Sequence, residues 1–224
     1  MTKTLIVVPV LNESAALTEQ LSRLSVLREQ GAEVLLVDGG SSDNTREIIR
    51  AKGLMLIESA RGRAIQMNAG ASAVSSEILI FLHADTRLPP EALLMVEKHL
   101  SQGRQWGRFD VRIVGTSSWL AMIAFFMNSR SRLTGIATGD QTLFMTREAF
   151  DAVGGFPIQP LMEDIEMSKR LKRLGAPVCL NDRVETSGRR WEQNGVWKTI
   201  VLMWRLRWAY WRGTPASALE RLYR

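Results

Sequence analysis

Short apolar runs alternate with helical patterns through the first half of the chain, and this alternation constrains the fold more than any other feature. Leu5–Val10 and Val34–Val37 are rich in Val, Leu and Ile, which is typical of strands buried on both faces of a sheet. Between them, Ala15–Glu29 has leucines at helical spacing, with Asn12 or Ser14 as a candidate N-cap. The alternation predicts a doubly wound α/β fold whose mostly parallel sheet is flanked by helices. The loops after the strands then share one sheet edge, where ligands bind.

The later segments extend this pattern less regularly. We expect further strands at Leu54–Ile57, Ile78–Leu82, Phe109–Val114 and Thr142–Thr146, and helices at Ser42–Ala51, Arg63–Ala73, Pro89–Leu100, Trp119–Met127, Arg147–Val153 and Asp164–Leu174. No internal repeat or linker interrupts the chain. The sequence therefore predicts one main domain over residues 1–190 and an amphipathic helical tail over residues 191–224.

Composition excludes several classes of protein. With 46% hydrophobic and 23% charged residues, the 224-residue chain is neither collagen-like nor disordered. Its single cysteine, Cys179, excludes an internal disulfide and a multi-cysteine zinc site. Because no run approaches the roughly 18 apolar residues of a membrane-spanning helix, we expect a cytoplasmic protein.

The net charge of +6 is confined to the C-terminal part of the chain. Residues 183–224 contain nine Lys and Arg against three Asp and Glu, whereas residues 1–182 contain twenty of each kind. A nucleic-acid-binding protein would spread its positive charge over the main fold. The tail, by contrast, is expected to meet an anionic partner or surface.

Five of the seven tryptophans lie within residues 191–211. On a helical projection Trp197, Val201, Trp204, Trp208 and Trp211 form one stripe, flanked by Lys198, Arg205 and Arg212 on one side and Arg207 on the other, with Leu202, Met203, Leu206 and Tyr210 opposite. We expect the opposite face to dock on the main domain. The stripe is then expected at the headgroup level of an anionic membrane, peripherally on the inner face of the cell membrane. Ordinary core or a dimer seam is the alternative for the stripe, and nucleic acid is not expected as a partner.

Polar side chains follow two of the predicted strands. Asp38 ends the second strand, where its carboxylate can accept a hydrogen bond from a base N–H or a ribose hydroxyl. His83 and Asp85, two residues apart after the fourth strand, point to the same side and can hold a divalent metal and a diphosphate. The glycine spacings of dinucleotide-binding loops and P-loops are absent, so any nucleotide is held in another way.

Three acids, Glu163, Asp164 and Glu166, crowd the start of a predicted helix. Favourable interaction with the helix dipole is one explanation for them. Their mutual repulsion also helps to keep one of them basic enough to accept a proton from a hydroxyl group.

Seven short motifs occur in a fixed order along the chain. They are Pro9-Val10-Leu11-Asn12-Glu13, the loop Val37–Thr45, the segment containing Arg63 and Asn68, His83-Ala84-Asp85, Gly139-Asp140-Gln141, Gly154-Gly155-Phe156 and Met162-Glu163-Asp164. This order resembles the family 2 glycosyltransferases, which have the GT-A fold, over roughly residues 3–190. It is most similar to a small bacterial branch labelled radical-SAM/selenodomain-associated transferase 2.

The resemblance implies an inverting transferase that moves a sugar from a nucleotide-sugar donor, UDP-linked in preference to GDP-linked, to an acceptor hydroxyl, plausibly of a lipid. It implies Asp164 as the catalytic base with Glu163 beside it, and Asp85 as a ligand of Mg²⁺ or Mn²⁺. The donor-binding residues implied are Pro9, Asn12, Glu13, Asp38, Arg63, Asn68, His83, Ala84, Asp85, Gly139, Asp140 and Arg190.

The chain departs from the family pattern at two positions. His83 stands where the metal-binding D-x-D motif usually has its first acid, and Gly39 replaces the second acid of the usual VDDGS loop. A sugar nucleotidyltransferase is one alternative function, although it normally needs a glycine-rich basic loop after the first strand. A non-catalytic module that binds nucleotide sugar or membrane is the other.

Overall fold

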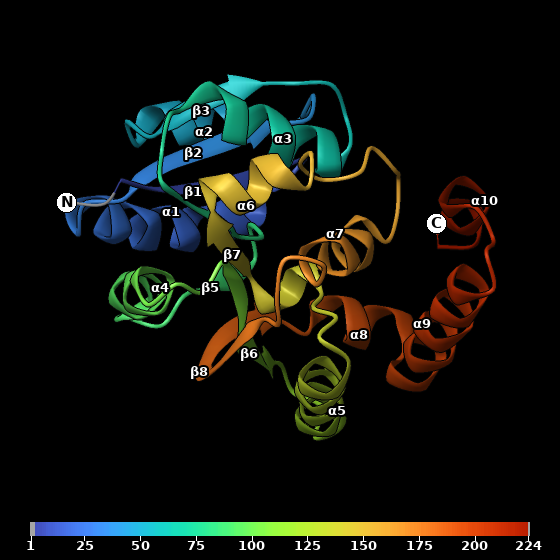
Figure 1. Ribbon diagram of the computed structural model, residues 1–224. Coiled ribbons are helices and arrows are strands. Elements are labelled where there is room, and N and C mark those ends of the chain that lie inside the picture. Colours follow the sequence, from blue (N-terminus) through green and yellow to red (C-terminus); the bar gives the residue numbers. More distant parts are fainter. Residues whose placement is uncertain (1–2, 224) are drawn as a thin grey trace.

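A computed structural model describes residues 3–223 and shows a central sheet with helices on both faces (Figure 1). The strands are β1 (Thr4–Val10), β2 (Glu33–Asp38), β3 (Met55–Glu58), β4 (Ile78–Phe81), β5 (Thr86–Arg87), β6 (Trp106–Val114), β7 (Leu143–Thr146) and β8 (Val178–Ser187). The helices are α1 (Ser14–Glu29), α2 (Thr45–Ala51), α3 (Arg63–Ala73), α4 (Ala92–Ser101), α5 (Trp119–Thr134), the 3₁₀ turn η1 (Gly139–Gln141), α6 (Arg147–Ala152), α7 (Glu163–Leu171), α8 (Arg189–Asn194), α9 (Val196–Trp211) and α10 (Ala216–Tyr223). The strand order is β3-β2-β1-β4-β7-β6-β8-β5.

The first four strands of this order are parallel, as the sequence predicts. Alternate residues of β1 face opposite sides of the sheet. Leu5 and Val7 pack under α3, α6 and α7, whereas Ile6 and Val8 pack under α1, α2 and α4. Both faces are therefore apolar and covered, which explains why the strand sequences are nearly continuous runs of aliphatic residues.

The second half of the sheet is mixed. β7 is antiparallel to both β4 and β6, β8 is parallel to β6, and the short β5 pairs antiparallel with β8. A register shift between Phe109 and Asp110 interrupts the pairing of β6 with β8. This arrangement places the ends of β1, β2 and β4 beside the η1 turn and the start of α7.

Several local predictions need correction. The N-cap of α1 is Glu13, without a side-chain capping bond, and neither Asn12 nor Ser14 takes that position. β5 and β8 were not expected from the sequence, and the predicted helical tail is divided into separate helices, of which α10 is the last. Helix α5 is longer than predicted, because it ends at Thr134 and not at Met127.

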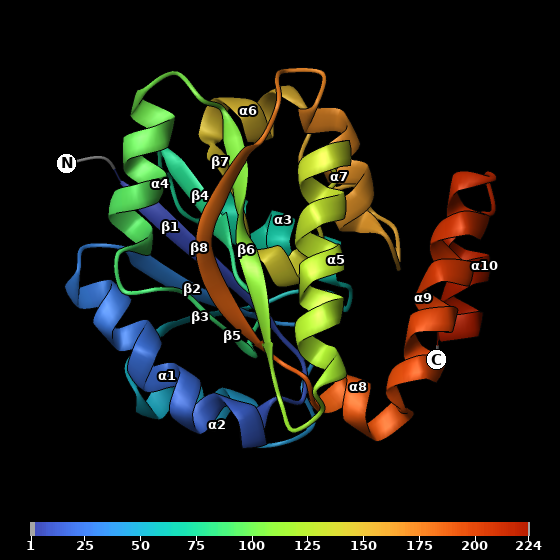
Figure 2. The same ribbon diagram turned by 90° about the horizontal axis from the view of Figure 1, so that it is seen from below.

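The C-terminal helices pack against the domain edge. The predicted boundary at residue 190 falls inside α8, so the boundary lies within a helix and not in a linker. Leu206 of α9 is buried with Met162 and Ile165 of the α7 region and with Leu219 of α10. Figure 2 shows α9 and α10 at one side of the molecule, next to the end where α5 begins. Within residues 3–223, none of the helices has both the length and the apolar content needed to cross a bilayer.

Candidate functional site

The loops after β1 and β2 are tied together by their own side chains. Asn12 has a left-handed backbone (φ 55°), its N–H donates to Ser41 Oγ at 2.9 Å, and its side-chain oxygen accepts from the N–H of Ser42 at 2.8 Å. The next N–H, of Glu13, donates to Thr45 Oγ1 at 2.9 Å. The motif that begins at Pro9 is therefore held in a fixed shape at the carboxyl edge of the sheet.

Asp38 is not presented to a ligand in this structure. Its side chain is completely buried, Oδ2 accepts from the N–H groups of Gly40 and Ser41 at 2.9 Å each, and Oδ1 accepts from the Ser41 hydroxyl. A buried carboxylate needs such partners. The observed role of Asp38 is to order its loop, and the predicted contact with a base or ribose stays untested.

Gln66 of α3 accounts for the departure at Gly39. Its amide donates to the carbonyl oxygens of Val10 and Val37 at 2.8 Å each and so joins the ends of β1 and β2. A Cβ at Gly39 would lie 3.0 Å from Cδ of Gln66. The amide thus takes up space beside position 39, where a second acid would have to fit.

His83 and Asp85 follow β4, as predicted, but their contacts differ. His83 Nδ1 lies 3.3 Å from Asp140 Oδ1, and its ring packs so closely on Gly139 that a Cβ there would overlap the imidazole. Asp85 is exposed, whereas Ala84 is buried in the core and offers a ligand only its backbone. Burial raises the pKa of Asp140, but the hydrogen bond and charge of His83, with Arg63 and Arg207, lower it overall.

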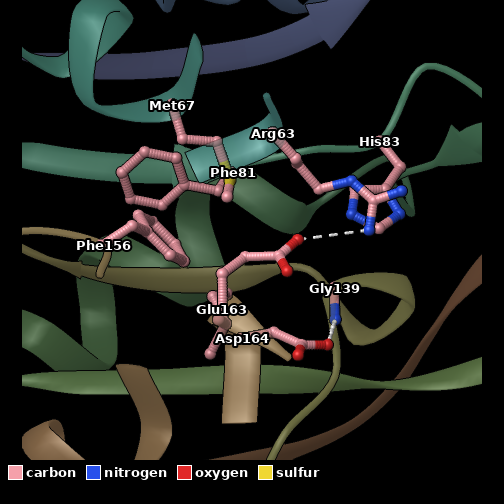
Figure 3. Close-up of a pocket in the computed structure, with 9 residues that line it drawn as sticks. Arg63, Met67, Phe81, His83, Gly139, Phe156, Glu163 and Asp164 are labelled. Carbon is pink, nitrogen blue, oxygen red and sulfur yellow. Dashed lines mark hydrogen bonds and ion pairs between the residues drawn. The ribbon is translucent and has the colours of Figure 1, made fainter. Parts of the chain in front are cut away.

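A narrow pocket of about 10 Å³, room for about one water molecule, lies between these loops and α7 (Figure 3). Phe81, Met67, Leu143 and Phe156 form its apolar wall, with the rings of Phe81 and Phe156 edge to face at 4.8 Å. Its polar side is formed by Arg63, His83, Gly139, Glu163 and Asp164. The pocket is far smaller than the roughly 300–1,000 Å³ of typical ligand pockets, so a ligand of nucleotide size would have to lie mostly outside it.

The adjacent acids Glu163 and Asp164 point in different directions within this pocket (Figure 3). Glu163 is buried and its Oε1 lies 3.4 Å from Arg63 Nη1. Asp164 Oδ2 accepts from the N–H of Gly139 at 2.8 Å, and Oδ1 accepts from the N–H of Ile165. Burial, followed by the charge of Asp164, raises the pKa of Glu163.

The third acid of the predicted cluster is not part of the pocket. Glu166 lies 3.5 Å from Lys169 and 3.8 Å from Arg170 on its own helix, and it accepts from the Tyr210 hydroxyl at 3.4 Å. The expectation that all three acids crowd one another is therefore wrong for Glu166. Only Glu163 and Asp164 act on each other.

Asn68 supports the glycine loop before α7. Its Nδ2 donates to the carbonyl oxygen of Phe156 at 2.8 Å, and its Oδ1 accepts from the Phe156 N–H at 2.9 Å. Gly155 (φ 69°) lies against this amide, and a Cβ there would be 2.9 Å from Oδ1. The contacts of Asn68 are structural, and the predicted contact with the donor stays untested.

Unusual backbone conformations gather around the pocket. Among residues 3–223, the non-glycine residues with positive φ are Asn12, Thr142 (φ 49°) and Met162 (φ 64°). They belong to the first loop, to the residue after η1 and to the residue before Glu163. Such conformations persist only where the surrounding structure imposes them, and they are common at functional sites.

The residues at the sheet edge fit a divalent cation that is shared with a diphosphate. Glu13 follows β1 and Asp85 follows the neighbouring strand β4, and burial and the charge of Asp85 raise the pKa of Glu13. Within residues 3–223 there is no group of three or more His, Cys, Asp or Glu side chains that can hold a metal unaided. Mg²⁺ and Mn²⁺ in nucleotide enzymes typically take one or two carboxylates and complete their shell with phosphate oxygens and water.

The C-terminal helices act electrostatically on the polar side of the pocket, although none of its lining residues comes from them among the described residues. The guanidinium of Arg190 lies 3.9 Å from the ring centroid of Tyr223 in α10. Burial raises the pKa of Tyr223, as do the charges of Asp140 and Glu163, whereas those of Arg190 and Arg63 lower it. Tyr223 therefore lies close to the polar side of the pocket.

The predicted division of α9 into two faces is observed. Leu206 is 1% exposed, whereas the stripe Trp197, Val201, Trp204, Trp208 and Trp211 is between 54% and 77% exposed. The alternative that the stripe belongs to the core of this chain is therefore wrong. Arg207 also differs from the prediction, because it is half-buried and the charges of Asp164 and Asp140 act on it.

Helix α5 adds an apolar surface that the sequence analysis missed. Its exposed side chains are Trp119, Phe125, Phe126 and Leu133, with exposed fractions of 43%, 64%, 61% and 87%. Trp119 contacts Trp197 with ring centroids 4.8 Å apart, so the two helices meet at their N-terminal ends. The spacing of seven residues between Trp119, Phe126 and Leu133 was a visible signal in the sequence, since it marks one helix face.

Comparison with known proteins gives consistent matches. The model of the family described as Glycosyl transferase family 2 matches residues 5–154. The succinoglycan biosynthesis protein ExoA of Rhizobium meliloti is 30% identical over 203 residues, which are 81% of this chain and 62% of that protein. The chain thus spans less than two thirds of the length of this relative.

Solved structures with the same fold include two transferases with bound donors. A mannosyltransferase from Pyrobaculum calidifontis in complex with GDP-Man and Mn²⁺ has a TM-score of 0.64 at 20% identity, covering 82% of this chain and 56% of that one. TarS from S. aureus in complex with UDP-GlcNAc has a TM-score of 0.64 at 19% identity, covering 83% and 58%. These matches confirm the predicted GT-A-type fold.

Proposed function

Because this chain belongs to glycosyl transferase family 2, we propose that its pocket transfers a sugar from a nucleotide-sugar donor to an acceptor hydroxyl with inversion. The observation that carries the proposal is the hydrogen bond from the Gly139 N–H to Asp164. Beside it, the buried Glu163 contacts the more exposed Arg63. The motif order is also that of the small bacterial branch labelled radical-SAM/selenodomain-associated transferase 2, and we propose membership of that branch on this resemblance.

The donor lies along the carboxyl edge of β1, β2 and β4 in this proposal. The loop of Asn12 and Glu13 covers the nucleotide, and Arg63 and Arg190 neutralise charge on the leaving diphosphate. UDP-sugars and GDP-sugars are the candidates, since the two donor-bound structures of the same fold hold one of each.

A divalent cation, Mg²⁺ or Mn²⁺, would be held by Asp85 together with the donor, with Glu13 close by. When bound it supplies positive charge that stabilises the leaving diphosphate. Glu163 holds the Arg63 guanidinium in position at 3.4 Å and so acts as a positioning residue.

Asp164 acts as the general base. It takes the proton of the acceptor hydroxyl while that oxygen bonds to the anomeric carbon, and the bond from this carbon to the donor phosphate oxygen breaks. The bonding electron pair leaves with the nucleoside diphosphate. A single displacement of this kind inverts the configuration of the sugar.

We further propose that residues 191–224 form a tail that holds the enzyme on a membrane surface, the inner face of the cell membrane, and that the acceptor is a lipid or lipid-linked molecule. The exposed tryptophans of α9 are flanked by Lys198, Arg205 and Arg212. Tryptophan prefers the membrane interface, and each basic residue near an anionic surface adds about 1 kcal/mol of attraction. The exposed aromatic residues of α5 enlarge this surface. A seam between two copies of the chain is the competing explanation.

Thermal unfolding with a panel of donors tests the proposal. UDP-, GDP- and dTDP-sugars are compared with and without Mn²⁺, and one class should raise the melting temperature only when Mn²⁺ is present. Binding of none of them at millimolar concentration contradicts the proposed function.

A further inference from the structure

The charge of Asp164 acts on two arginines outside the predicted site. Arg130 belongs to α5 and Arg207 to α9, and both are half-buried. Burial, followed by the charges of Arg207 and Arg108, lowers the pKa of Arg130 to about 10, although the charge of Asp164 opposes these effects. Burial likewise lowers the pKa of Arg207 against the charges of Asp164 and Asp140. Packing supports this placement, because Leu206, next to Arg207, is buried against Ile165 of α7, and Ile136 of the segment after α5 packs on the same cluster.

Arg130 lacks the partners that a buried cation requires. Its Nε and Nη2 are buried, and neither has a hydrogen-bond partner among the residues that the structure describes. Buried polar groups are almost always hydrogen-bonded, and a buried charge without a partner costs several kcal/mol. The two unpartnered N–H groups are adjacent in one guanidinium, which is the geometry that binds two oxygens of one anion.

The acids nearby do not fill this role. Among the described residues, Asp164 accepts hydrogen bonds from the N–H groups of Gly139 and Ile165 and none from Arg130, and Asp140 pairs with His83. The other arginine whose charge acts on Arg130 is Arg108, which is fully buried and bonded to Asp110.

We propose that Arg130 and Arg207 bind a phosphate group carried by the acceptor, next to the hydroxyl that Asp164 activates. This inference rests on the proposed function, since it assigns the acceptor side of the same site. The two helices that supply the arginines carry none of the residues matched to the donor, and they are the helices with the exposed aromatic surface. The acceptor is therefore a phosphorylated alcohol, either the headgroup of a phospholipid or a soluble compound.

Calorimetric titration of the full chain with inorganic phosphate, at fixed ionic strength and without any donor, tests the proposed phosphate site. The variants are Arg130→Gln and Arg207→Gln, and the matched control is Arg205→Gln, which removes the same charge from an exposed position of α9. We expect at least a tenfold weaker phosphate affinity in both variants and less than a twofold change in the control.

If Arg130→Gln does not fold, Arg207→Gln decides alone, because its side chain is partly exposed. Equal phosphate affinity in Arg207→Gln and Arg205→Gln overturns the proposal. Absence of phosphate binding by the wild type also overturns it. Donor binding is measured separately on the wild type. If the wild type binds no donor, the proposed function fails, but the phosphate titration still tests the proposed phosphate site.

Two further arms identify the source of the phosphate. Vesicles of phosphatidylglycerol and phosphatidylcholine are compared with soluble sn-glycerol 1-phosphate. A lipid acceptor predicts that Arg207→Gln loses more vesicle binding than Arg205→Gln. A soluble acceptor predicts equal losses on vesicles and a selective loss of glycerol phosphate binding in Arg207→Gln.

Discussion

Replacing Trp204 and Trp208 by alanine should separate membrane binding from folding. Their side chains are 72% and 60% exposed, and neither belongs to the buried cluster formed by α7, α9 and α10. Exposed side chains away from packed features change the free energy of unfolding by about 0.5 kcal/mol or less. The double variant should therefore unfold at nearly the temperature of the wild type.

The size of the membrane effect follows from the exposed area. A tryptophan side chain presents about 200 Å², so the exposed parts of these two amount to about 260 Å². If about half of this area enters the interface, its transfer is worth about 3 kcal/mol at about 25 cal/mol per Å². The partition coefficient onto anionic vesicles should then fall about 100-fold, since about 1.4 kcal/mol corresponds to a factor of ten.

Co-sedimentation with phosphatidylglycerol vesicles at low and high salt measures this effect. Binding of the wild type should weaken with salt, because charges are screened beyond about 8 Å at physiological ionic strength. The matched control is Leu94→Ala on α4, an exposed apolar residue at 68% on another part of the molecule (Figure 2), which should bind normally. If the wild type does not bind anionic vesicles at low salt, or if the double variant is unfolded, the membrane-binding role of these tryptophans is refuted.

Three other perturbations probe the pocket itself. Gly139→Ala should lower the free energy of unfolding by about 1–3 kcal/mol in urea titrations, because its Cβ would overlap the His83 ring, and an unchanged stability would contradict the packing. Asp85→Ala should stay folded and lose Mn²⁺-dependent donor binding, whereas equal donor affinity with and without EDTA in this variant would refute the metal role. Because the pKa of Glu163 is raised above 4.5, the native state binds its proton more tightly than the unfolded state. The free energy of unfolding should thus fall as the pH rises from 4.5 through the native pKa, and Glu163→Gln should flatten that fall in urea titrations across this range.

The parts of the fold that were predictable are those whose burial depends on local pattern. β1 and β2 appear in the sequence as aliphatic runs because both faces of the sheet are covered there. The His83–Asp85 and Glu163–Asp164 motifs were found because polar residues at the ends of apolar segments stand out. Their position beside one another depends on the antiparallel β7, whose first residue, Leu143, pairs with Phe81 and so brings the preceding η1 turn next to His83.

Other features depend on contacts that no local pattern encodes. β8 contains the exposed residues Asn181, Asp182 and Arg183, so it does not resemble a buried strand, and only its pairing with β6 defines it. Asp38 appeared available for a ligand, but the folded loop buries its carboxylate under three donors. Arg130 gave no sequence signal, since its significance arises from Arg207 on a helix far along the chain.

Release of nucleoside diphosphate from a nucleotide sugar in the presence of Mn²⁺, measured together with donor affinity, tests whether Asp164 is the catalytic base. General-base catalysis contributes typically about 10²–10⁴ in rate. We expect Asp164→Asn to reduce turnover at least 100-fold while its donor dissociation constant stays within about twofold of the wild type, because asparagine has the same shape and its amide oxygen can keep the hydrogen bond from the Gly139 N–H. An Asp164→Asn variant that releases nucleoside diphosphate at the wild-type rate would contradict the assignment of Asp164 as the base.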